Sequence, residues 1–309
     1  MERGLLSDKE LAADYDSVVW MYLFQDFSHS DADRAAERLA IRFGISSWPQ
    51  HFLVDPFTLT KVADTGRSLA SFRAAVKKAR IAGGEARPTA AELEAADGLA
   101  NRLEKNADVA LAKKHLRHTD RVVAFRALQV IAEKSPTDLL AESAWLLAQP
   151  NDQIRGLACD VLAQHGDVEA RDLLHGIVRN PEPSENPNVM RIRATKALAR
   201  CGDVSSLAVV EPFAASGEYR NGLTMTAIQT VVAIAEREKA AKAPAVVVLA
   251  KAYPAPPGAT GMEAAAAEQR MCESLAKNVH ETLQKLTGKK VAFPSAYTDA
   301  ARKKLMASW

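Results

Sequence analysis

The apolar and polar positions of the chain follow two patterns, one before and one after residue 88. In the first part, the apolar run at residues 18–24 predicts a strand and residues 31–43 an amphipathic helix. Two further strands are predicted at residues 52–54 and 61–63, and a closing helix from Ser68. Residues 81–88 contain two glycines and a proline, which interrupt regular structure. From residue 89 onward apolar residues recur at helical spacing. We therefore predict an α/β domain over residues 1–82 and an all-α domain over residues 88–309.

The helical part of the sequence repeats itself. In residues 151–178, apolar side chains fall at i, i+3, i+4, i+7 and i+8 of one helix, and a Gly-Asp pair separates it from a second helix with the same pattern. Shifting this unit by 36 residues places Arg155 on Arg191 and Asp167 on Asp203. One pair of helices cannot bury both of its faces, so recurring pairs predict an α-solenoid in which neighbouring pairs stack.

The repeated residues are an apolar residue followed by Arg, then Ala, Leu and Gly-Asp, and over residues 153–214 they resemble bacterial HEAT-like repeats. The resemblance implies a scaffold that binds a protein or peptide partner on the concave face of the solenoid. Arg155 and Arg191 have two interpretations. They could form an inter-repeat ladder with Asp167 and Asp203, which would be structural, or they could bind the partner.

Residues 43–55 combine a helix exit, an X-Pro corner at Trp48-Pro49 and a buried strand. This stretch and the elements around it resemble a thioredoxin-type domain. The resemblance implies that Pro49 is cis and that the backbone at Trp48 pairs with a substrate peptide, although Trp48 could equally cover the end of the sheet. Residues 1–12 resemble the helix that begins at the Cys-x-x-Cys motif of such domains. We therefore expect an incomplete thioredoxin-like fold whose first strand and redox motif lie before the start of this chain.

Local signals predict where several helices begin and end. Thr89 and Glu92 have the spacing of a capping box, which starts a long helix. A later helix over residues 263–286 has an apolar stripe that includes Met271, and it ends at Gly288. The tail that follows is predicted to fold back as a cap on the last repeat, using four residues: Phe293, Tyr297, Leu305 and Trp309.

Composition narrows the classes of partner. The 40 Lys and Arg nearly balance the 38 Asp and Glu, so nucleic acid is not favoured. The apolar runs are shorter than the roughly 18 residues of a membrane span, so we predict no membrane partner. The first residues lack the pattern of a signal peptide. We expect a cytoplasmic location by default, and an extracytoplasmic one if a leader precedes this chain.

Candidate catalytic and metal-binding side chains are few. The three cysteines, Cys159, Cys201 and Cys272, have neither redox nor zinc spacing and lie in apolar helical patterns, so we expect them to be buried. His115 and His118 could share a metal, but Lys and Arg neighbours favour two solvated histidines. We predict no cofactor and no metal.

These patterns support three functional hypotheses. The first is a protein-interaction scaffold with a redox-inactive thioredoxin-like domain and a HEAT-like solenoid. The alternative is a thiol-disulfide oxidoreductase whose Cys-x-x-Cys motif is encoded just before Met1. The third and weakest is the lyase or base-excision activity of some HEAT-like families, which needs a basic or pigment-binding groove that the composition does not indicate.

Overall fold

The computed structural model describes residues 9–18, 21, 30–45, 51–55, 60–66, 68–79, 88–149, 151–165, 167–184, 186–216, 222–257 and 262–309. The chain divides into two compact units. The first is Met1–Pro136 with Asn151–Gln153, and the second is Thr137–Pro150 with Ile154–Trp309. Within the described ranges, no helix is both long enough and apolar enough to cross a membrane.

The first unit begins with a small α/β arrangement. It contains the 3-10 helix η2 (Lys9–Ser17), helix α1 (Asp31–Phe43), strands β1 (Phe52–Asp55) and β2 (Thr60–Asp64), and helix α2 (Leu69–Lys78). The helix predicted at residues 31–43, the two strands after it and the helix after Ser68 are confirmed. The strand predicted at residues 18–24 is not: Val18 and Met21 lie outside any strand, and the rest of that run lies outside the described residues.

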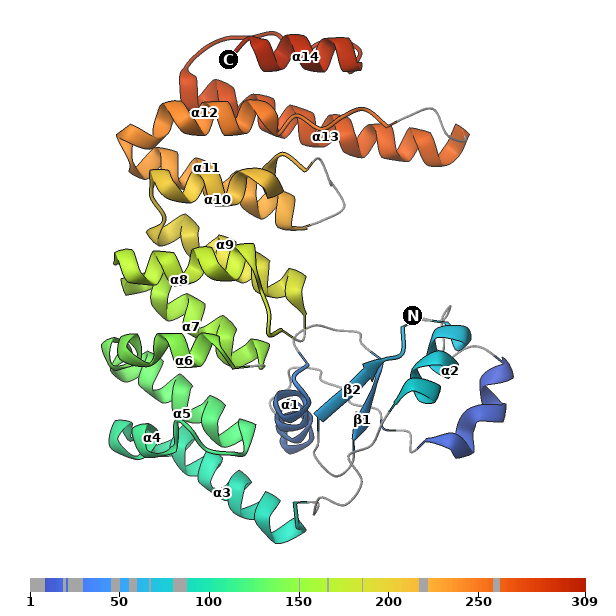
Figure 1. The fold of residues 1–309 in the computed structure, drawn as a ribbon, viewed down its shortest axis with the longest axis vertical. Helices are drawn as coiled ribbons and strands as arrows, with labels where there is room; N and C mark the ends of the chain where they lie inside the picture. Colours follow the sequence, from blue (N-terminus) through green and yellow to red (C-terminus); the bar gives the residue numbers. More distant parts are fainter. Residues whose placement is uncertain are drawn as a thin grey trace. The chain divides into compact units, whose positions relative to one another are not determined.

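The two strands form an antiparallel hairpin with a helix on each face. Phe52 lies opposite Asp64, and the register shifts between Leu53 and Val54. Phe52 and Val54 pack against the buried residues at the end of α1, whereas Leu53 packs against those of α2 and η2. Successive strand residues point to opposite faces, so the sheet lies between α1 and α2 (Figure 1).

Gly66 makes the turn from β2 into α2. Its φ is +64°, and a Cβ at this position would lie 2.7 Å from the side-chain oxygen of Ser71. A residue with a side chain would be strained there, both by the left-handed backbone and by this contact. Ser71 is held in place because it completes a capping box with Ser68 at the start of α2.

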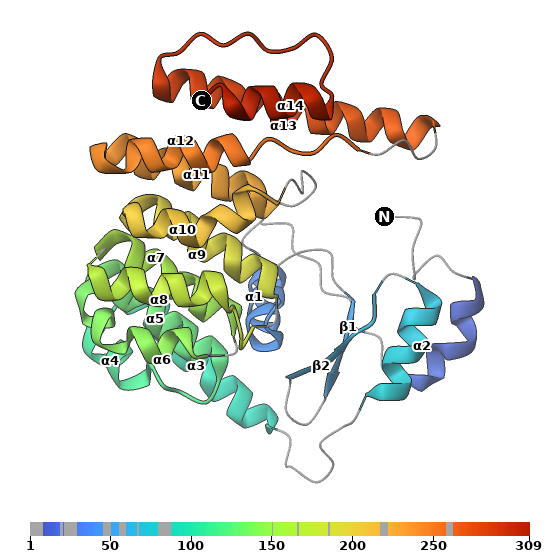
Figure 2. The same cartoon turned by 45° about the horizontal axis from the view of Figure 1, so that its top comes forward.

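Three helices complete the described part of the first unit before Pro136: α3 (Ala90–Asn106), α4 (Val109–His115) and α5 (Arg121–Lys134). The predicted capping box is confirmed, since the Glu92 N–H donates to the Thr89 hydroxyl at 3.2 Å and the Thr89 N–H donates to Glu92 Oε2 at 2.7 Å. Helix α5 packs against α3, α4 and α1. Figures 1 and 2 both show α1 between the hairpin and these helices. The predicted boundary at residues 82–88 lies mostly outside the described residues. Helix α1, before this boundary, contacts α5, after it.

The described elements of the second unit are helices, two of which begin with residues assigned to the first unit. These elements are η3 (Pro136–Glu142), α6 (Ser143–Leu147), α7 (Asp152–His165), α8 (Val168–Arg179), α9 (Pro187–Cys201), α10 (Val204–Ala214), α11 (Gly222–Arg237), η4 (Lys239–Ala241), α12 (Lys242–Lys251), α13 (Met262–Thr287) and α14 (Asp299–Ala307). Helix α11 packs beside α9 and α13, and α8, α10, α12 and α14 pack in succession. The helices therefore form two layers, as Figures 1 and 2 show. This arrangement is compatible with the predicted helical repeats.

Two of these helices start in the same way. Asp167 caps α8, with its carboxylate accepting from the Ala170 N–H at 2.7 Å, and Asp203 caps α10 by accepting from Ser205 N–H at 2.8 Å. Both caps fall one sequence period apart, as predicted. Gly202, beside the second cap, has an ordinary φ of −66°. A glycine is needed at this position because a Cβ would lie only 2.5 Å from the carbonyl oxygen of Leu198.

The predicted C-terminal helix is confirmed with one correction. Gly288 ends α13 in the left-handed region, with φ +73°, and its N–H donates to the Gln284 carbonyl at 2.8 Å. Met271 does not belong to the buried stripe, since it is 41% exposed. The neighbouring Cys272 is buried in its place and lies three residues before the buried Leu275.

Candidate functional site

The structure describes two of the four predicted binding residues, and these two donate to different carbonyl groups. Trp48 and Pro49 lie outside the described residues, so the cis bond and the peptide contact remain predictions. Arg155, on α7, is fully buried and donates to the carbonyl of Pro183. Arg191, on α9, donates to the carbonyl of Val178 at 3.3 Å.

An arginine outside the predicted ladder forms an ion pair between repeats. Arg171, on α8, pairs with Asp203 of α10 at 2.8 Å. The guanidinium of Arg191 instead lies 5.8 Å from the ring centre of Phe213. Arg155 and Arg191 therefore pack within the second unit. A partner could reach the guanidinium of Arg155 only if the fold opened, because that side chain has no exposed surface.

All three cysteines are free and buried, as predicted from their helical apolar surroundings. Burial raises the pKa of the Cys159 thiol to about 12 and also raises the pKa of Cys201 and of Cys272. A thiol must ionise to attack a disulfide. These three thiols are therefore in surroundings that suppress that chemistry.

Sequence reasoning missed a serine, a histidine and an aspartate that lie in line. His175 Nε2 lies 2.8 Å from the Ser206 hydroxyl, and His175 Nδ1 lies 3.8 Å from an oxygen of Asp172. The order resembles a hydrolytic triad, but Ser206 is fully buried and its oxygen also accepts from the Asp203 N–H at 3.2 Å. A substrate cannot reach this hydroxyl in the folded state, so the group serves to cap α10. Burial, assisted by the charge of Arg179, lowers the pKa of His175.

His115 and His118 lie near each other, with ring centres 5.8 Å apart. Burial lowers the pKa of His115, and the adjacent charges of His118 and Lys114 lower it further. His118 Nδ1 accepts from the backbone N–H of Asp120 at 3.0 Å, so this ring helps to shape the turn before α5. Across the described ranges, no group of three or more His, Cys, Asp or Glu side chains could hold a metal ion.

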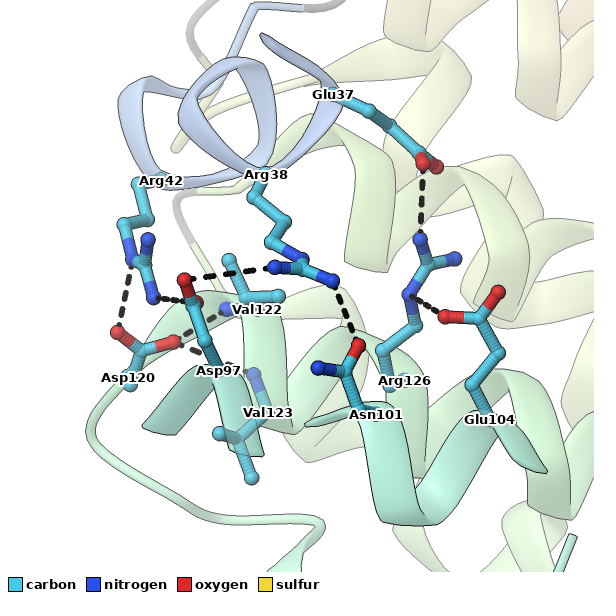
Figure 3. Close-up of polar contacts among 10 residues, drawn as sticks. All are labelled: Glu37, Arg38, Arg42, Asp97, Asn101, Glu104, Asp120, Val122, Val123 and Arg126. Carbon is cyan, nitrogen blue, oxygen red and sulfur yellow. Dashed lines mark hydrogen bonds and ion pairs between the residues drawn. The ribbon is translucent and has the colours of Figure 1, made fainter. Parts of the chain in front are cut away.

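A cluster of arginines and carboxylates, which we call the arginine cluster, holds α1 against α3 and α5 (Figure 3). Its most buried member is Arg42, in the last turn of α1. The Arg42 guanidinium bonds to Asp97 of α3 at 2.6 Å and to Asp120 at 3.0 Å. Burial lowers the pKa of Arg42, but the two carboxylates outweigh burial and raise that pKa above its usual value. This side chain therefore keeps its charge inside the interface.

Two further arginines extend the same interface. Arg38 of α1 donates to the Asn101 side chain at 2.6 Å and lies 3.5 Å from Asp97. Arg126 of α5 reaches in the other direction and bonds to Glu37 of α1 at 2.9 Å. Asp120 also caps α5, because its other carboxylate oxygen accepts from the Val122 N–H at 2.9 Å. The arginine cluster couples the position of α1 to the start of α5.

The C-terminal tail folds back on the second unit, as the sequence predicts. The Trp309 indole N–H donates to the Tyr253 hydroxyl at 3.1 Å, and this hydroxyl lies 2.9 Å from His280 Nδ1. His280 Nε2 lies 2.8 Å from the Val291 carbonyl, which is an acceptor only, so Nε2 carries a hydrogen. Tyr297 donates to the Pro254 carbonyl at 2.8 Å. Burial raises the pKa of Tyr253 to about 12, which keeps its hydroxyl protonated.

The folded tail forms one wall of an apolar groove, which we call the C-terminal groove. Helix α12 forms the other wall, and the groove has a volume of about 460 Å³. The residues that line it include Val246, Val247, Ala250, Thr287, Met306 and Trp309. Val247 is 56% exposed.

Comparisons of the chain with protein-family models, curated protein sequences and solved structures found no match.

Proposed function

We propose that this protein is a scaffold that binds a protein partner through an array of HEAT-like helical pairs. The two helical layers support this proposal, together with the matching aspartate caps of α8 and α10 one period of 36 residues apart. Stacked pairs contact mainly their neighbours and present extended surfaces to a partner.

The α/β part of the first unit belongs, in this proposal, to the thioredoxin-like class. Support comes from the order α1, β1, β2, α2, from the antiparallel hairpin, and from the helices on its two faces. Trp48 and Pro49, which precede β1, would then meet an extended peptide, and Arg155 and Arg191 would support the repeats from within. The alternative activity, thiol-disulfide exchange, needs an accessible dithiol, and the three cysteines of this chain are buried in helices.

The observation that carries the proposal is the C-terminal groove, because an open groove with a mostly apolar lining is the kind of surface on which an amphipathic helix docks. A photo-crosslinking amino acid that replaces Val247 tests the proposal in cells in which this protein occurs naturally. The same amino acid at Val168, which is 61% exposed on α8, is the matched control.

We expect one protein to crosslink through position 247, and the same protein, once purified, to bind the wild-type chain but not Val247→Glu. Equal crosslinking from both positions, or equal binding by both chains, would contradict a role for the C-terminal groove. If neither position gave a crosslink above background, the scaffold proposal itself would fail.

A further inference from the structure

We propose that the C-terminal groove binds an amphipathic helical segment of a partner protein whose apolar face is flanked by Asp and Glu. This inference rests on the proposed scaffold function and names the chemistry of its partner. Two observations carry it: the apolar lining of the groove, and the charge of the two elements that form its walls.

The apolar lining suits the ridge of a helix. Val246, Val247 and Ala250 lie at i, i+1 and i+4 on α12, and Met306 and Trp309 lie at i and i+3 at the end of the chain. Positions i and i+4 share one face of a helix, so Val246 and Ala250 lie side by side on α12, whereas Trp309 follows the end of α14. Ala250 has only a methyl group, so a partner backbone can approach closely between larger side chains. A groove of this kind matches the way amphipathic helices dock, with apolar anchors one turn apart.

The elements that form the walls are basic, although Lys251, the charged residue among those that line the groove, already pairs with Glu211 of α10 at 2.5 Å. Residues 239–253 contain three lysines and no acid, and residues 287–309 contain five Lys or Arg and one acid, Asp299. The Asp299 carboxylate forms ion pairs with Arg302 at 3.1 Å and with Lys303 at 2.8 Å. Exposed Lys239, Lys242 and Lys304 have no acidic partner within the described ranges. The whole chain has a net charge of only +2, so this basic character is local and calls for a partner of opposite charge.

The wall formed by the tail is already in place before a partner arrives. Trp309 is fixed through Tyr253, and Lys289 Nζ donates to the Trp309 carbonyl at 3.1 Å and to the Ser308 carbonyl at 3.4 Å. A preformed wall reduces the ordering that binding would otherwise require. A flat anionic membrane would meet the lysines but would not fill the recessed apolar floor, so the groove favours a helix over a lipid surface.

The test uses the full chain and three labelled synthetic peptides of about 18 residues. The first has Leu at i, i+3, i+4 and i+7 and Glu on both flanks, the second has Lys in place of each Glu, and the third has Ser in place of each Leu. Binding is measured by fluorescence anisotropy. We expect the acidic amphipathic peptide to bind, the other two to bind at least about tenfold more weakly, and added salt to weaken the first complex.

Two variants locate the binding surface. Val247→Glu places a carboxylate in the C-terminal groove and should weaken the acidic peptide by about tenfold or more. Val168→Glu changes an equally exposed valine in the first turn of α8, where a carboxylate suits the helix dipole, and should leave binding unchanged. Circular dichroism confirms that both variants fold.

Three outcomes would overturn the proposal: no binding of the acidic peptide, equal binding of the basic peptide, or equal loss of binding in both variants. If the acidic peptide fails and the chain instead binds phosphatidylserine vesicles, with binding lost only in Val247→Glu, the groove would be a membrane site. If the peptides fail but a protein still crosslinks through position 247, the scaffold proposal stands and only the acidic chemistry is wrong. If the crosslink also fails, both proposals fall.

Discussion

Replacing Arg42 tests whether the arginine cluster holds the first unit together. The variant Arg42→Met keeps most of the apolar stem and removes the charge. The side chain of Arg42 is only 8% exposed, and it bonds to Asp97 and Asp120. Removing it leaves two carboxylates without their main cation in a partly buried interface, and the remaining charges then repel each other.

The expected loss follows from burial. Removing one partner of a buried ion pair costs roughly 3–5 kcal/mol, because the other charge is left uncompensated. Asp97 is 31% exposed and Asp120 15%, so water can partly solvate both. We therefore expect about 3 kcal/mol, the low end of that range. The matched control is Arg34→Met, also on α1, whose partner Asp31 is fully exposed; exposed pairs contribute about 0–1 kcal/mol.

Hydrogen exchange followed by mass spectrometry locates the effect. Since about 1.4 kcal/mol corresponds to a factor of ten, residues of α1 and α5 should lose about a hundredfold of protection in Arg42→Met, whereas α9 and α11 should change little. A double-mutant cycle with Asp97→Asn should show coupling, since the two side chains are in contact. If Arg42→Met and Arg34→Met lose the same free energy of unfolding, or if the cycle shows no coupling, the arginine cluster does not stabilise this interface.

Three substitutions and one test of thiol reactivity examine the second unit. Asp167→Ala should lower the free energy of unfolding by about 0.5–2 kcal/mol through the lost cap, and Leu162→Ala by about 2–5 kcal/mol through a core cavity; the reverse order in urea titrations would contradict the assigned burial. Because the folded pKa of His175 is lowered, the unfolded chain binds more protons below about pH 6.5 and stability falls as pH falls through that range. His175→Gln should flatten this part of the curve, and an unchanged slope would assign it to other groups. The three buried thiols should react with a disulfide reagent only after unfolding, and a thiol of the native protein that reacts at the rate of a free cysteine would refute their burial.

Elements set by local patterns could be predicted from the sequence. The bounds of α1, the two strands, the capping box at Thr89 and the aspartate caps of α8 and α10 each depend on residues within a few positions of one another. The folded tail was also predictable, because its large apolar residues follow a helix that ends at a glycine. The residues that this tail contacts could not be predicted. The hydroxyl that accepts from the Trp309 indole belongs to Tyr253, 56 residues away, and spacing within the tail carries no information about it.

The candidate sites were harder to predict because they depend on packing between distant elements. Arg155 and Arg191 occupy equal places in the repeat, but one is fully buried and the other packs on Phe213, so the inter-repeat ion pair falls to Arg171 instead. No pattern in the sequence indicates the C-terminal groove either. Val246 and Val247 lie in an apolar run typical of a core, but Val247 is 56% exposed in the fold and lines the groove together with Met306 of α14.

Helix α1 shows how a polar face can be misread. Its charged residues have the pattern of a solvated surface, and Arg42 in the last turn suits the negative end of the helix dipole without any further partner. In the fold, the apolar face of α1 packs on the hairpin and its polar face meets α3 and α5, so the helix is covered on two sides. Burial is tolerated because the three arginines of the cluster face Asp97, Asp120, Glu37 and Glu104, and charges are stable in an interior only when paired. Asp97 and Asp120 lie 55 and 78 residues from Arg42. Two surfaces that each read as solvated therefore become one interface because their charges are complementary, and helical periodicity cannot detect that property.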